Sequence, residues 1–255
     1  PATAAGQYLM AGTSGDDGVL YVGPIDASGG DSHTVAYPDA TQTSAYGPDQ
    51  VTASVVRVVG SYVGADGPTR YGFLYEGTTA DFAVPELYTT IRPASNPEFT
   101  YAHSTAGGLV VGNYDSQSAS GAPVGAGNAF LYDIASGAFL DDIVFPGAAS
   151  NTAYGIWSNG GTSYTICGGY SLAAVNNLAS DADQNKPIGQ AFLVDYDSAT
   201  GVYGNWKSFS YPLGVNDVSY VTHFQGVSSL EAGVYTIAAT SSRAGGDGTP
   251  IGSFV

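Results

Sequence analysis

Short apolar segments alternate with polar turns along the whole chain. A typical segment, "YTICGGYS" at residues 164–171, places its apolar residues on alternate positions and contains no charge. Alternation with a period of two over four to eight residues, bounded by Gly, Asn, Asp and Ser, is the pattern of a half-buried β-strand. We therefore expect an all-β protein in which helices are almost absent.

The segments recur in a fixed order of four landmarks. A small-residue strand such as "TSAYG", "TYAHS", "TAYGI" or "HFQGV" precedes an apolar strand ending in glycine, such as "VVRVVGSYV". A third strand such as "RYGFLYEG", "GNAFLYDI" or "GQAFLVDYD" follows, and then an Asp/Ser/Gly turn and an outer strand ending near proline, as in "AYP" and "VFP". Each cycle spans about 50 residues, the period of a four-stranded propeller blade, and about five cycles fill the chain.

This repeat predicts a five-bladed β-propeller that forms one domain over residues 1–255. A β-sandwich or an open barrel with the same number of strands is the alternative. The ends are the least regular part: the first cycle lacks an inner strand unless residues 2–6, "ATAAG", supply it, and the last stops in its third strand, "IGSFV". Because the chain opens "PATAAGQ" without Met, we expect a processed or trimmed N terminus.

The third-strand landmark resembles a known motif. Residues 129–133, "AFLYD", and residues 191–195, "AFLVD", resemble part of the HAF repeat of bacterial extracellular proteins, as do "TAYGIWSNGG" and "GGYS". The leading His of that motif is replaced by Asn128 and Gln190. The resemblance implies a secreted or cell-surface location, and it carries no assigned catalytic residues.

Charge narrows the range of partners. The chain has 22 Asp and Glu against six Lys and Arg, a formal net charge of −16, so it would repel phosphate backbones and anionic membrane surfaces. We therefore expect no nucleic-acid partner. We interpret the many acidic residues as a means of keeping the protein soluble in an extracellular or saline setting. No run of about 18 apolar residues is present, so we expect no membrane insertion. The single Cys167 is expected to be a small buried hydrophobe.

Loop lengths point to one face as the binding face. In a four-stranded meander, the loops from second to third strand and the crossovers between blades emerge at the same end, and both classes are long here, as in residues 171–189. Long loops on a rigid scaffold commonly carry binding sites. Inner strands begin at that face, so we expect their residues to surround the mouth of a central channel: Tyr46, Tyr101, His103, Tyr154, Trp157, His223 and Gln225.

Aromatic rings with amide and imidazole donors suit a sugar or another small polar ligand, through stacking and hydrogen bonds. The alternative is that these aromatic residues pack between blades. A general base would come from the three histidines, His33, His103 and His223, of which His33 is expected on a surface strand. We assign His103 to the position that Gly47, Gly155 and Gly226 occupy in the other inner strands, where a large ring departs from the pattern.

His103 and His223 are therefore candidate catalytic residues of a cofactor-independent hydrolase or lyase, although spacing identifies no nucleophile or second base. A two-carboxylate glycosidase is disfavoured because the inner strands carry almost no acids, Asp49 being the nearest candidate.

Metal sites are weakly indicated. Asp181, Asp183 and Asn185 imitate the start of a calcium loop, but Lys186 stands at its turn glycine and Phe192 at its bidentate Glu. We expect a solvated loop and no cofactor, with calcium in another geometry as the alternative, and no His and Cys pattern indicates zinc.

Three functions remain open from the sequence. The first is a secreted acidic β-propeller that binds a small polar ligand, a carbohydrate or another extracellular protein through its loop-rich face. The second is the hydrolase or lyase, and the third is a structural or assembly module. Because the candidate positions differ between repeats, a single site is favoured over one site per blade.

Overall fold

The structure is a computed structural model that describes residues 2–4, 6–26, 28–117, 123–172, 189–210, 212–214, 217–231, 233–243 and 253–254. Within these ranges the regular structure consists of β-strands and one short 3-10 helix, η1 (Pro85–Leu87), with no α-helix. The all-β prediction is confirmed. In the same ranges no helix is long and apolar enough to cross a membrane.

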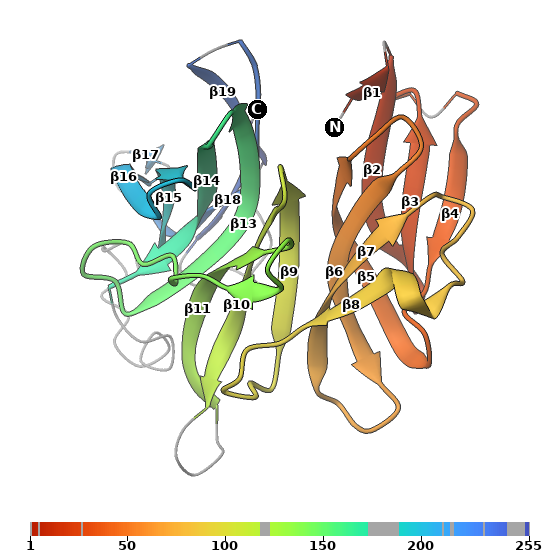
Figure 1. Cartoon of the computed structure of the whole chain (residues 1–255). Coiled ribbons are helices and arrows are strands. Elements are labelled where there is room, and N and C mark those ends of the chain that lie inside the picture. Colours follow the sequence, from red (N-terminus) through yellow and green to blue (C-terminus); the bar gives the residue numbers. More distant parts are fainter. Residues whose placement is uncertain are drawn as a thin grey trace. The chain divides into compact units, whose positions relative to one another are not determined.

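The strands form antiparallel meanders in chain order (Figure 1). The first sheet contains β1 (Ala2–Ala4), β2 (Gln7–Ser14), β3 (Asp17–Gly23) and β4 (Asp31–Val35). The second contains β5 (Ala40–Gln50), β6 (Val56–Gly64), β7 (Arg70–Gly77) and β8 (Tyr88–Ile91). The third has the order β12-β11-β10-β9, from β9 (Thr100–Ala106), β10 (Leu109–Gln117), β11 (Pro123–Asp133) and β12 (Ala138–Phe139).

The fourth sheet holds eight strands, because the fourth and fifth repeats meet through one parallel pair, Gly189 with Val221. It comprises β13 (Ser150–Gly160), β14 (Ser163–Ser171), β15 (Gly189–Asp197), β16 (Val202–Phe209), β17 (Pro212–Gly214), β18 (Asp217–Glu231), β19 (Val234–Arg243) and β20 (Ser253–Phe254). None of the sheets closes on itself among these described strands.

The chain divides into two compact units, residues 1–105 and residues 106–255. Unit 1 contains the first two sheets, and unit 2 contains β10 to β20. The expectation of one domain over residues 1–255 stays a prediction.

The repeated landmarks correspond to repeated packing. Phe73, Phe130 and Phe192 stand at the same place in the third strand of successive repeats, and each is fully buried. Burying a side chain of this size contributes about 1.5–3 kcal/mol relative to leaving it exposed. The third-strand motif therefore recurs in these three repeats because each of them buries the same large apolar side chain in its core.

The irregular ends of the chain also form strands. β1 pairs with β2, so Ala2–Ala4, within the segment that the sequence left open, supplies a strand at the inner position of the first repeat. β20 pairs antiparallel with β19, Ala239 facing Phe254, as expected for the third strand of the last repeat.

Candidate functional site

Three of the predicted site residues occupy one recurrent structural position. The pairing register of inner strands β5, β13 and β18 shifts at Tyr46, Tyr154 and Gln225, each the single residue between two paired neighbours. Such a β-bulge redirects the side chain of the extra residue, and bulges are frequent beside active sites.

His103 belongs to the same set, one residue away from where the sequence placed it. A Cβ built on Gly47 would lie 2.5 Å from the His103 carbonyl oxygen and 2.7 Å from Ser104 Cα. At the corresponding place in unit 2, a Cβ on Gly155 would lie 3.0 Å from Gly226 Cα. Ser104 therefore corresponds to Gly226, and His103 corresponds to the bulge residue Gln225. Our assignment of His103 to a glycine position was wrong, and its size breaks no rule.

In unit 1 the structure brings three predicted residues together. The His103 ring lies 5.3 Å from that of Tyr46 and 5.8 Å from that of Tyr101, nearly parallel to the latter. Tyr46 Oη also lies 3.0 Å from Ser61 Oγ. All three rings are half-buried. Mutual packing of this kind agrees with the packing alternative for these aromatic residues.

In unit 2 His223 packs against Tyr154, with ring centroids 5.6 Å apart. Burial lowers the pKa of His223, so its imidazole is neutral near pH 7. Gln225 is exposed and donates to Thr240 Oγ1 at 3.1 Å. The seven predicted residues thus fall in two different units, and the hydrolase or lyase based on His103 or His223 stays a prediction.

Much of the predicted loop-rich face falls outside the described residues. This is true of residues 173–188, with the calcium candidates Asp181, Asp183 and Asn185, and of residues 244–252. Within the described part of the chain, no cluster of three or more His, Cys, Asp or Glu side chains could hold a metal ion.

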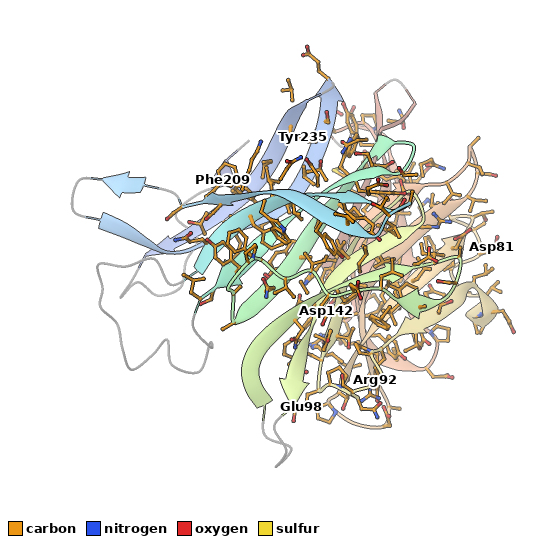
Figure 2. All side chains as sticks on the ribbon, turned by 60° about the vertical axis from the view of Figure 1, so that its left-hand side comes forward. Asp81, Arg92, Glu98, Asp142, Phe209 and Tyr235 are labelled. Atoms are coloured by element: carbon orange, nitrogen blue, oxygen red, sulfur yellow. The ribbon has the colours of Figure 1, made fainter. Side chains whose placement is uncertain are left out.

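A hollow of about 690 Å³ lies in unit 2 at the opposite ends of the strands. The residues that line it belong to the β13–β14, β15–β16 and β18–β19 hairpins, near their turns. Tyr235, at the start of β19, is labelled in Figure 2. We name this hollow the turn-end pocket. Trp157 lines it, whereas we had expected Trp157 at the loop-rich end. The other side chains that line it include Asn159, Asp195, Tyr196, Asp197, Thr200, Val202, Asn205, Glu231 and Tyr235.

A polar network fixes the floor of the turn-end pocket. Asp195 Oδ2 accepts a hydrogen bond from Asn205 Nδ2 at 2.9 Å, and its Oδ1 lies 3.3 Å from the hydroxyl of buried Thr165. Thr165 Oγ1 is also 2.9 Å from Tyr235 Oη. Asn159 closes the network, since its Nδ2 donates to Thr165 (3.0 Å) and its Oδ1 accepts from Tyr235 (3.1 Å). These polar groups are therefore held in fixed directions before any ligand arrives.

Comparison with the second repeat shows what is distinctive about Asp195. There Glu76 pairs with Arg57 across the same two strands as Asp195 with Thr165, and Arg57 Nε binds Glu76 Oε2 at 2.7 Å. In the fourth repeat the neutral hydroxyl group of Thr165 stands in place of the Arg57 guanidinium. Asp195 has no ion pair among the described residues, so its negative charge remains available to the pocket.

The remaining charges in the turn-end pocket have the same sign. Asp197 and Glu231 line it, and none of the described residues around it is Lys or Arg. Hydrogen bonds, chiefly from the Ala199 backbone N–H, hold the pKa of Asp197 below its usual range, so this carboxylate stays charged at neutral pH. The pocket therefore favours neutral or positively charged groups over anions.

Sequence reasoning identified Trp157 but missed Asn159, Asp195, Asn205 and Tyr235. The two asparagines stand in Gly-, Ser- and Thr-rich segments that read simply as turns, and Asp195 closes the repeated "AFLVD" motif. A comparison of the repeats could have identified Asp195. In the second repeat the acid Glu76 faces Arg57, whereas in the fourth repeat Asp195 faces the neutral Thr165.

Comparisons with known proteins leave the family open. No family model matches the chain, and no curated protein matches it either. A solved structure of TolB from Acinetobacter baumannii aligns with 94% of this chain at 10% identity and a TM-score of 0.44. The chain spans 50% of the length of that TolB chain. A likeness at this level carries no argument about fold or function, and the resemblance to HAF repeats stays a prediction.

Proposed function

We propose that this protein is a binding module that takes a neutral or amine-bearing saccharide in the turn-end pocket. One observation carries the proposal: Asp195, held by Asn205 and Thr165 and without an ion pair among the described residues, lies in the same hollow as Trp157.

The chemistry of this pair suits a sugar. An indole face packs against the C–H face of a pyranose ring, while carboxylate and amide groups bind its hydroxyl groups. The acids Asp195, Asp197 and Glu231 add an attraction for a protonated amine, and they oppose a uronic acid. Among saccharides, an amino sugar therefore matches the pocket best.

The wider setting is also a proposal. The meander repeats support a five-bladed β-propeller, with one blade per cycle. The acidic composition supports a secreted or cell-surface location. Within that fold the site would use the turn ends of the strands, whereas the sequence had favoured the loop-rich face.

Calorimetric titration with three disaccharides tests the proposal: β-1,4-linked glucosamine, its N-acetylated form, and a disaccharide containing glucuronic acid. We expect the glucosamine disaccharide to bind most tightly and the acidic one not to bind. Asp195→Asn removes the charge but keeps the shape, and it should weaken glucosamine binding at least about tenfold, the usual scale for a charged hydrogen bond.

Asp133→Asn is the matched control, because Asp133 holds the equivalent position in the third repeat and does not line the pocket. It should leave binding unchanged. The proposal fails if none of the three disaccharides binds at millimolar concentration, or if the two variants weaken binding equally.

A further inference from the structure

A second hollow adjoins the turn-end pocket. It has a volume of about 360 Å³ and is lined by Phe139, Leu140, Asp141, Tyr196, Gly201 and Tyr203. Tyr196 lines both hollows. The two spaces therefore share a wall, the hairpin formed by the end of β15 and the start of β16.

The residues of this hairpin divide between its two sides. Val202 and Gly204 line the turn-end pocket, while Gly201 and Tyr203 line the second hollow, as the alternation of side chains along a strand requires. Thr200 belongs to the first hollow and its neighbour Gly201 to the second, so the hollows meet at the hairpin tip.

The hairpin tip is held in place and leaves space above it. The Ser198 N–H donates to the Thr162 carbonyl at 2.8 Å, which fastens the tip to the β13–β14 turn. The Gly201 N–H donates to the Asp197 carbonyl at 2.8 Å and closes the turn itself. Gly201 has a φ of +70°, and a Cβ built there would meet no heavy atom within 4 Å. The space beside the Gly201 Cα is therefore open on the side where a side chain would stand.

The second hollow has the chemistry of a further sugar subsite. The Tyr203 ring lies 4.8 Å from that of Tyr196, and its hydroxyl donates to the Asp141 carbonyl at 3.0 Å, which fixes its orientation. Leu140 is 37% exposed and offers an apolar contact. In the part of the chain that the structure describes, this hollow is lined by Asp141 and by neither Lys nor Arg, so it selects against anions as the first one does.

We propose that the ligand is a linear oligosaccharide that crosses the hairpin tip and occupies both hollows. This inference rests on the proposed function of the turn-end pocket. The two hollows lie on opposite faces of the hairpin, so a ligand that occupies both must extend across the hairpin tip. The second hollow then makes the site selective for chain length.

Titration with β-1,4-linked glucosamine oligomers of two to six residues tests the inference. We expect the hexamer to bind at least about tenfold more tightly than the dimer, a difference of ~1.4 kcal/mol. Leu140→Ser should remove most of this gain and leave dimer affinity unchanged. Val144→Ser is the control, because Val144 is 51% exposed on the same segment and lines neither hollow.

The outcomes separate the two proposals. Equal affinities for dimer and hexamer would overturn the second subsite and leave the proposed function standing. If Leu140→Ser leaves the affinity difference between hexamer and dimer unchanged, the second subsite is likewise overturned. The tighter binding of the hexamer would then come from the several positions at which a longer chain can enter the turn-end pocket, or from another surface. Absence of binding by every oligomer would overturn the proposed function and the second subsite with it.

Discussion

At the scale of single residues, glycines of the second strand show how the repeat is enforced. Gly60 and Gly168 each pair with the buried Phe of the third strand. A Cβ on Gly60 would collide with the Ser44 carbonyl oxygen, and a Cβ on Gly168 with that of Thr152. The inner strand thus approaches the second strand so closely that no side chain fits between them. This contact explains why the second landmark ends in glycine.

Alanine at these glycines should therefore destabilise the protein. We expect Gly60→Ala and Gly168→Ala each to lower the free energy of unfolding by about 1–3 kcal/mol, the cost of overpacking, in urea denaturation. Gly12 is the matched control: it pairs with Val19 at the equivalent position, but β1 is too short to cover it, and a Cβ there meets nothing within 4 Å. A loss from Gly12→Ala as large as from Gly60→Ala would contradict this account.

At the scale of elements, a repeated corner joins an outer strand to the next inner strand. In unit 1 the Tyr37 N–H donates to buried Thr43 Oγ1 at 2.9 Å, and the Tyr37 ring stacks on Tyr62 at 3.6 Å. Unit 2 repeats the arrangement. The Phe145 N–H donates to Asn151 Oδ1 at 2.9 Å, and the centroid of the Phe145 ring lies 3.7 Å from that of the stacked Tyr170 ring. The aromatic residue before proline in "AYP" and "VFP" is therefore the connector between successive sheets.

Removing the acceptor at this corner should weaken it. Thr43→Val keeps the shape of the side chain but leaves the Tyr37 N–H unpaired, and we expect a loss of about 1–3 kcal/mol in unfolding free energy. Thr89→Val, at an exposed position of β8, should change stability by less than about 0.5 kcal/mol. Equal losses in the two variants would show that the corner hydrogen bond does not contribute.

At the scale of the whole molecule, the excess of acidic residues opposes folding. Among the described residues, three arginines are engaged internally: Arg57 with Glu76, Arg70 with Gln42, and Arg92 over the Tyr71 ring. The 22 acidic residues thus face a surface with little positive charge, and their mutual repulsion opposes the compact state.

Salt should relieve this repulsion. Raising NaCl from 10 to 300 mM shortens the Debye length from about 30 Å to less than about 8 Å, so we expect the thermal unfolding midpoint at pH 7 to rise by several degrees. Near pH 4, where about half of the carboxyl groups are protonated, the rise should largely disappear. A rise of equal size at both pH values would indicate general salting-out instead of charge screening.

The sequence predicted the strands well because packing imposes similar residues at the same place in several repeats, as with Phe73 and Gly60 in the second repeat and Phe192 and Gly168 in the fourth. It misplaced His103 because Ser104 stands where the other inner strands have glycine: aligning "TSAYG" with "TYAHS" places His103 with Tyr46 and Ser104 with Gly47. It missed Asn205 and Asp195 because their residue types are typical of turns, and strand periodicity does not tell which turns converge on one hollow.

We propose that the repeats form a scaffold and that ligand binding takes place where the fourth and fifth repeats differ from the others, at the turn-end pocket. A crystal structure of the protein grown with the β-1,4-linked glucosamine hexamer tests it most directly. The account predicts sugar rings against Trp157 and Asp195, continuing over Gly201 to Leu140. Sugar bound at the rings of Tyr46, Tyr101 and His103, with the turn-end pocket empty, would contradict it.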